Sequence, residues 1–340
     1  MKPRFIIPLT AVIAASALLF TGCAGKEKLL RSTKEEATVI GTVGGFDVPM
    51  ELYRYVALNY RADYENGETD VWLGESGSEL LEKLNTSVDD TIVSLYTTMA
   101  MCKDYGISAD DEYITDTVER KMGDIYGSYA EDYRAYNDDL ESYNMNDSVY
   151  RFITRNDVLA EELSAEMVKR GEIPDFSDKE AFREIAEGDE FIRVKQILVA
   201  VDGERDDGEL YEKAEMIKAK LDAGADFETV LWDEGEDVFM FSNDDGYYIS
   251  RGSFYTEFED AAFALDIGET SGIVKTPAGY CIIKRYEKEP DYIDGNLEDM
   301  YLTYRDGLYN LALEAKKAEL KVEWNEKAEK YTIFNLKNAK

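Results

Sequence analysis

The chain has 340 residues, 44% of them hydrophobic, so it is long enough to bury more than one core. Its 38 basic and 72 acidic side chains give a net charge of −34, which argues against binding to nucleic-acid phosphates or anionic membrane surfaces. The sequence contains no histidine, which excludes Ser-His-Asp triads, Cys-His pairs, HExxH zinc sites and histidine pH switches. The excess of acid predicts a solvated surface; repulsion from an anionic envelope and attraction of basic client proteins are the alternatives.

Residues 1–22 have the pattern of a bacterial targeting segment. A basic start is followed by an apolar run over residues 5–20, which is shorter than the ~20 residues that a spanning helix needs. The run ends in "LLFTGC", which resembles a bacterial lipobox and would make Cys23 a diacylated N-terminus after cleavage. We therefore predict a signal peptide over residues 1–22, a lipid anchor at Cys23 and a charged tether over residues 23–36. A plain secretory signal with an incidental cysteine is the alternative.

Helical periodicity dominates residues 37–188. A glycine-rich strand or hairpin around Val39 and Val43 comes first. Apolar residues then recur at steps of three and four over residues 80–102 and 147–169, the spacing of amphipathic helices. Cys102 falls on such a face and is predicted to be a buried small hydrophobe. The sequence thus predicts an N-terminal helical domain.

Four tyrosines between these helices fall at helical spacing: Tyr126, Tyr129, Tyr133 and Tyr136. As one stripe on one helix they would present broad rings with a polar tip. Core packing explains such a stripe. A surface that binds client polypeptides is the second interpretation, because tyrosine gives contact area at low entropic cost.

Residues 191–286 show a different pattern. Residues 193–201 form a short run rich in β-branched residues, typical of a buried strand, and an amphipathic helix capped by Gly224 follows. A second helix is predicted over residues 257–265, and the last strands over residues 271–275 and 279–285. The segment "SNDDGYY", which lies between the two predicted helices, lacks the ligand spacing of a calcium loop and is predicted to be a turn.

The motifs "GADFETV", "FEDAAFAL", "GETS" and "GYCIIK", in this order and spacing, resemble a parvulin-type peptidyl-prolyl isomerase domain. We assign this domain to residues 189–288. The rest of the chain resembles the PrsA and SurA group of extracytoplasmic foldases. The resemblance implies an α+β fold in which a four-stranded, mainly antiparallel sheet with flanking helices is inserted into a helical chaperone domain. Residues 289–340, which also show an apolar helical stripe, would return to complete that domain.

The resemblance also implies site residues. The family usually carries histidines where this sequence has Gln196 and Cys281, and a third polar site where Asp233 and Asp237 are the candidates. Phe254 and Phe258 match the residues that line the family's proline pocket. Neither a metal nor a cofactor is implied.

These residues predict a membrane-anchored extracytoplasmic foldase that assists unfolded or partly folded secreted polypeptides. Because both family histidines are replaced, we predict that its isomerase activity is weak or lost. The alternatives are a non-catalytic holding chaperone and a binding lipoprotein of envelope assembly.

Overall fold

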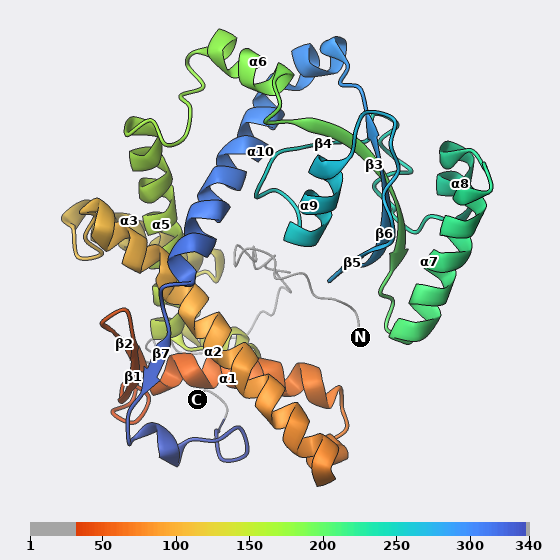
Figure 1. Cartoon of the computed structure of the whole chain (residues 1–340). Coiled ribbons are helices and arrows are strands. Elements are labelled where there is room, and N and C mark those ends of the chain that lie inside the picture. Colours follow the sequence, from red (N-terminus) through yellow and green to blue (C-terminus); the bar gives the residue numbers. More distant parts are fainter. Residues whose placement is uncertain (1–31, 338–340) are drawn as a thin grey trace. The chain divides into compact units, whose positions relative to one another are not determined.

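The structure, a computed structural model, describes residues 32–337 (Figure 1). The predicted signal peptide, Cys23 and most of the predicted tether lie outside the described residues. The chain divides into two compact units. One contains residues 167–312, and the other contains the described residues up to 166 together with residues 313–337. Both units mix helix and strand, so the predicted α+β fold class is confirmed.

A four-stranded antiparallel sheet forms the centre of the unit at residues 167–312. Its strand order is β4-β3-β6-β5, and the strands are β3 (Ile192–Ala200), β4 (Tyr247–Ile249), β5 (Val274–Thr276) and β6 (Gly279–Tyr286). In the central pair Gln196 lies opposite Ile283 and Leu198 lies opposite Cys281. Because side chains alternate along a strand, these four residues point to the same face of the sheet.

Two of these strands differ from the sequence prediction. β4 was missed: it has only three residues, and the first two, Tyr247 and Tyr248, belong to the segment "SNDDGYY" that was predicted to be a turn. β5 begins at Val274 rather than at Ser271, whose backbone N–H is instead bonded to the Ile283 carbonyl. Pairing with the neighbouring strand, β3 for β4 and β6 for β5, decides where these edge strands begin.

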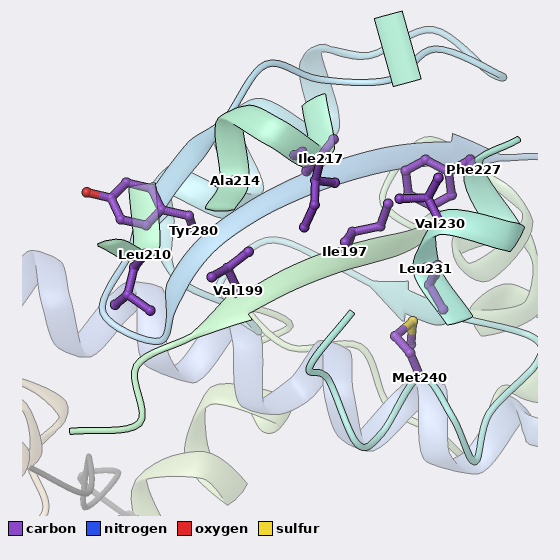
Figure 2. Close-up of a cluster of buried hydrophobic side chains, with 11 residues drawn as sticks. Ile197, Val199, Leu210, Ala214, Ile217, Phe227, Val230, Leu231, Met240 and Tyr280 are labelled. Carbon is purple, nitrogen blue, oxygen red and sulfur yellow. The ribbon is translucent and has the colours of Figure 1, made fainter. Parts of the chain in front are cut away.

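One face of this sheet is covered by α7 (Asp207–Asp222) and α8 (Phe227–Glu234). Figure 2 shows the apolar cluster between these two helices and the sheet. The sheet contributes Ile197, Val199, Tyr280 and Ile282, and the helices contribute Leu210, Ala214, Ile217, Phe227, Val230 and Leu231. Asp206 closes a capping box at the start of α7, which fixes where this helix begins.

The opposite face is covered by α9 (Thr256–Ala264), on the other side of β3 and β6 from α7 and α8 (Figure 1). The buried cluster between α9 and this face of the sheet consists of Ile192, Val194, Ile249, Phe258, Ala262, Leu265, Cys281 and Ile283. The Gln196 side of the sheet therefore faces α9.

A third apolar cluster extends this unit beyond the sheet. It joins α6 (Lys179–Glu187) to the first part of α10 (Pro290–Lys317) through Phe182, Ile293 and Met300. The unit is thus larger than residues 189–288, because both flanking helices bury their apolar faces against it.

The other unit is mostly helical. Its helices are α1 (Met50–Glu65), α2 (Gly74–Tyr105), α3 (Glu112–Ser128), α4 (Tyr133–Ser142) and α5 (Asp147–Lys169), with 3-10 turns at Asp70–Trp72 and Ala328–Lys330. A small antiparallel sheet has the order β2 (Phe46–Pro49), β1 (Val39–Val43) and β7 (Val322–Trp324). Since β7 pairs with β1, the end of the chain is part of the same unit as its first described strands. Cys102 is 1% exposed on α2, as predicted.

The four tyrosines do not form one stripe on one helix. Tyr126 lies in the last turn of α3 and Tyr133 begins α4, because Ala130 and Glu131 adopt positive φ between the two helices. The rings nevertheless meet: the Tyr136 ring centroid lies 5.1 Å from that of Tyr126. Tyr136 is 1% exposed and donates its hydroxyl to Asp147 at 2.9 Å, so its ring is packed in the core. Tyr126, Tyr129 and Tyr133 are only partly buried.

Among residues 32–337 we find no helix that has both the length and the apolar character to cross a membrane.

Candidate functional site

The face of the sheet under α9 gathers the residues that the sequence singled out. The rings of Phe254 and Phe258 are stacked with centroids 5.1 Å apart and an angle of 25° between their planes. Both belong to the cluster that contains Cys281, and Gln196 projects from β3 to the same side. Phe258 is 1% exposed, whereas Phe254 is half-buried at the rim. These four side chains therefore share one face of the sheet.

Asp237 joins them and Asp233 does not. The Gln196 Nε2 atom donates to Asp237 Oδ2 at 2.7 Å, and both side chains are 8% exposed. The Phe239 backbone N–H donates to the other carboxylate oxygen at 3.0 Å. Asp233 is exposed near the end of α8. The two candidates are four residues apart, and only the course of the chain after α8 decides between them.

Tyr247, on the missed strand β4, completes the site. Its hydroxyl donates to Asp237 Oδ2 at 2.9 Å, and its ring lies edge-on to Phe254 with centroids 5.1 Å apart. A sequence signal for it exists only in Gly246, whose φ of +79° and close approach to the Val194 carbonyl require glycine at the turn before β4. Tyr247 links the polar centre to the aromatic pair.

The site holds neutral groups around one carboxylate. Burial raises the pKa of the Cys281 thiol to about 12, opposed by a contact with Thr276. Burial and the charge of Asp237 raise the pKa of Tyr247 well above its usual range. At neutral pH both groups therefore keep their protons, and Cys281 is not a thiolate nucleophile.

One buried polar atom in the site has no partner. Gln196 Oε1 accepts no hydrogen bond, while its Nε2 is committed to Asp237. An unsatisfied buried acceptor costs roughly 1 to 3 kcal/mol, so this oxygen lowers the stability of the fold. The oxygen of the Gln196 amide therefore has unused acceptor capacity.

The loop that carries Phe254 is held from two sides. The buried Glu259 carboxylate on α9 accepts from the backbone N–H of Gly252 at 3.0 Å and of Phe254 at 2.7 Å. Behind the loop, Gly252 meets Gly307 of α10 so closely that a Cβ at Gly252 would lie 2.2 Å from the Gly307 carbonyl oxygen. The Phe254 ring is thereby positioned by backbone contacts.

This arrangement places a stacked aromatic pair beside a hydrogen-bonding amide. Within residues 32–337 no three His, Cys, Asp or Glu side chains are grouped to hold a metal ion. The chemistry available to these residues is therefore binding and polarisation, without a nucleophile.

Comparison with known proteins gives the same picture. Residues 195–287 match the family model of the PPIC-type PPIASE domain, or rotamase. Foldase protein PrsA 2 of Bacillus cereus is 32% identical over 158 residues, which are 42% of this chain and 51% of that protein. Foldase protein PrsA of Caldanaerobacter subterraneus is 26% identical over 305 residues, 84% of this chain and 86% of that protein. The chain thus spans about half the length of the first of these relatives.

Among solved structures, PrsA from Bacillus anthracis covers 67% of this chain and 94% of its own, with 22% identity and a TM-score of 0.35. The match to the family model includes Gln196, Asp237, Tyr247, Phe254, Phe258 and Cys281. The chain therefore contains a parvulin-type, PPIC-type peptidyl-prolyl isomerase domain, and the two relatives described above are PrsA foldases.

Proposed function

We propose that this protein is an extracytoplasmic foldase and chaperone that binds proline-containing segments of unfolded or partly folded secreted polypeptides. The observation that carries the proposal is the stacked Phe254–Phe258 pair beside the buried Gln196–Asp237 centre, on one face of a PPIC-type domain. The apolar pair would hold the pyrrolidine ring. The unpaired Gln196 Oε1 would accept a backbone N–H of the client.

The isomerase activity of this site is proposed to be weak or absent. Rotation about an Xaa-Pro bond crosses a barrier of ~18–20 kcal/mol, and a catalyst must favour the twisted amide over both planar forms. The best donors in the site are already used, since Gln196 Nε2 and the Tyr247 hydroxyl both donate to Asp237. The Cys281 thiol is only a weak donor. The site would then bind the client polypeptide with its Xaa-Pro amide planar more tightly than it binds the twisted amide of the transition state.

Attachment to the membrane through a lipid on Cys23 is part of the proposal. The support is the "LLFTGC" motif and the charged residues that follow it, both in the sequence. Membrane fractionation of cells that express the full chain or its Cys23→Ala variant tests it. Recovery of the variant in the membrane fraction at the level of the full chain would contradict anchoring through Cys23.

The isomerase proposal is tested on residues 24–340 with a tetrapeptide Xaa-Pro substrate. We expect kcat/KM to be about 10²-fold to 10³-fold below that of a histidine-bearing parvulin, the loss typical of a missing preorganised donor. The double variant Gln196→His/Cys281→His should recover part of this rate. Turnover by the unaltered chain equal to that of the histidine-bearing enzyme would refute impairment.

A holding chaperone without isomerisation is the second candidate, favoured by the commitment of both donors to Asp237. The chain would then suppress aggregation of a denatured client at the same level in the unaltered form and in the double histidine variant. A gain in refolding rate limited to proline-dependent clients in the double variant separates the foldase from this candidate.

A further inference from the structure

The unit formed by the two ends of the described chain contains a cavity of about 430 Å³. It lies between α1, α2, β7 and the last described residues, and it has no part in the site under α9. Its walls are unusually aromatic: Tyr53, Trp324, Tyr331 and Phe334 all line it. Ligand pockets commonly hold ≈ 300–1,000 Å³, so the space is sufficient for a side chain with its neighbouring backbone.

The Trp324 ring is set in place by its partner strand. Trp324 lies opposite Gly41 in the β1–β7 pair, and a Cβ at Gly41 would come within 2.8 Å of the ring carbon Cε3. The absence of that Cβ leaves room for the ring beside β1. Tyr53 of α1 meets the same ring edge-on, with centroids 5.4 Å apart. The planes of these two large aromatic rings meet at 75° in the wall of the cavity.

One carboxylate lies in this aromatic wall. Asp89 of α2 lines the cavity, and its Oδ1 atom accepts from the Trp324 indole N–H at 3.1 Å. Among residues 32–337 it forms no ion pair with a lysine or arginine. Burial raises the pKa of Asp89 above its usual range, while the indole N–H opposes the shift. The charged carboxylate is therefore underpaired, and a cation in the cavity would stabilise it.

The remaining wall comes from the chain end. Arg61 Nη1 donates to the Ile333 carbonyl at 2.8 Å, and the Phe334 ring meets Trp72 edge-on at 6.0 Å. Arg61 is itself paired with Glu65 at 2.8 Å, so its charge is already compensated. The tail is held against α1 by these contacts.

We propose that this cavity binds a lysine or arginine side chain of an unstructured polypeptide segment. The aromatic walls accommodate the apolar stem and attract the cation through their π faces, and Asp89 supplies the opposite charge. A net charge of −34 on the whole chain raises the local concentration of basic segments. This inference rests on the proposed handling of polypeptides, but it concerns a separate site that does not require proline.

The test measures, by fluorescence anisotropy, the affinity of residues 24–340 for a labelled decapeptide. The peptide contains no proline and has one lysine between two leucines. A second peptide carries norleucine in place of the lysine. We expect the lysine peptide to bind about tenfold more tightly, within the range of a desolvated cation–π contact. Asp89→Asn should abolish this preference. The matched control is Asp90→Asn, which removes the same charge from the exposed neighbouring position of α2 and should change the affinity less than twofold.

An equal loss in both variants would overturn the proposal, because it would mean general attraction by the acidic surface. Trp324→Leu is the second variant, and it should weaken both peptides while Asp89→Asn weakens only the lysine peptide. Tetramethylammonium chloride, compared with sodium chloride at equal ionic strength, distinguishes a site for small free cations. Competition by millimolar tetramethylammonium that matches the lysine peptide would overturn recognition of a polypeptide.

Failure of this proposal is distinguishable from failure of the proposed function. Binding of a proline tetrapeptide, measured on the same Asp89→Asn sample, should be unchanged. If the proline peptide does not bind to the unaltered chain but the lysine peptide does, the function proposed for the α9 face is wrong and the cavity proposal holds.

Discussion

The two faces of the four-stranded sheet use alternate residues of the same strands, but they are built for different purposes. Under α7 and α8 the cluster is apolar except for the Tyr280 hydroxyl, which donates outward to Asp207 at 3.0 Å. Under α9 the face buries the amide of Gln196 with the carboxylate of Asp237, and one amide oxygen lacks a partner. The first face contributes stability to the fold, whereas the second gives up some stability at the proposed binding site.

The largest expected effect comes from Phe258→Ala on the α9 face. Phe258 is 1% exposed, so losing its ring should lower the free energy of unfolding by about 3 to 5 kcal/mol. It should also weaken binding of a proline tetrapeptide, because Phe254 loses the ring on which it stacks. Urea unfolding and peptide anisotropy measure the two effects. A variant that is destabilised but binds the peptide normally would remove Phe258 from the site.

Ile217→Ala tests the α7 face in the same way. Ile217 is fully buried in the apolar cluster, and the truncation should cost about 2 to 4 kcal/mol of unfolding free energy. Peptide affinity, measured where the variant is still folded, should stay within twofold of the unaltered chain. A specific loss of affinity here would mean that the two faces are coupled through the sheet.

The sequence predicts these faces unequally, for physical reasons. Strands β3 and β6, the apolar faces of α2 and α5, and the aromatic pair are predictable because each follows a local period or a family motif. β4 is a three-residue strand whose existence depends on pairing with residues about fifty positions earlier, so Tyr247 was missed. The choice of Asp237 over Asp233 depends on where the chain passes after α8. The helix break between Tyr126 and Tyr133 results from the positive φ of Ala130 and Glu131. Neither residue is a glycine, so the sequence gives no sign of this backbone conformation.

The thiol of Cys281 gives a pH-dependent test. Its pKa is raised by burial from 9.0 to about 12, so the protonated thiol contributes stability below pH 9, which is lost as the pH rises toward 12. Above pH 9 the unfolding free energy should fall faster in the unaltered chain than in Cys281→Ala, by at most about 1.4 kcal/mol per pH unit. Cys102, also a buried thiol, is present in both proteins and its contribution cancels. Parallel pH curves would mean that water reaches Cys281 in the folded state.

The smallest change in unfolding free energy is expected for Gln196→Leu. Gln196 and Ile197 are neighbours on β3 and point to opposite faces of the sheet, so a polar and an apolar side chain can be tested on each face. Gln196→Leu removes the unpaired amide oxygen, and Asp237 keeps the Tyr247 hydroxyl and the Phe239 N–H as donors. The loss of one donor and the gain of apolar burial should nearly cancel, leaving the unfolding free energy within about 1 kcal/mol of its original value. The matched control is Ile197→Gln, which places an amide in the apolar cluster under α7 without a partner and should cost about 2 to 4 kcal/mol. If Gln196→Leu is as damaging as Ile197→Gln, the amide is a structural part of the α9 face and the unpaired oxygen does not mark a binding site. If it is nearly neutral and proline-peptide binding falls, the polar centre is retained for the client.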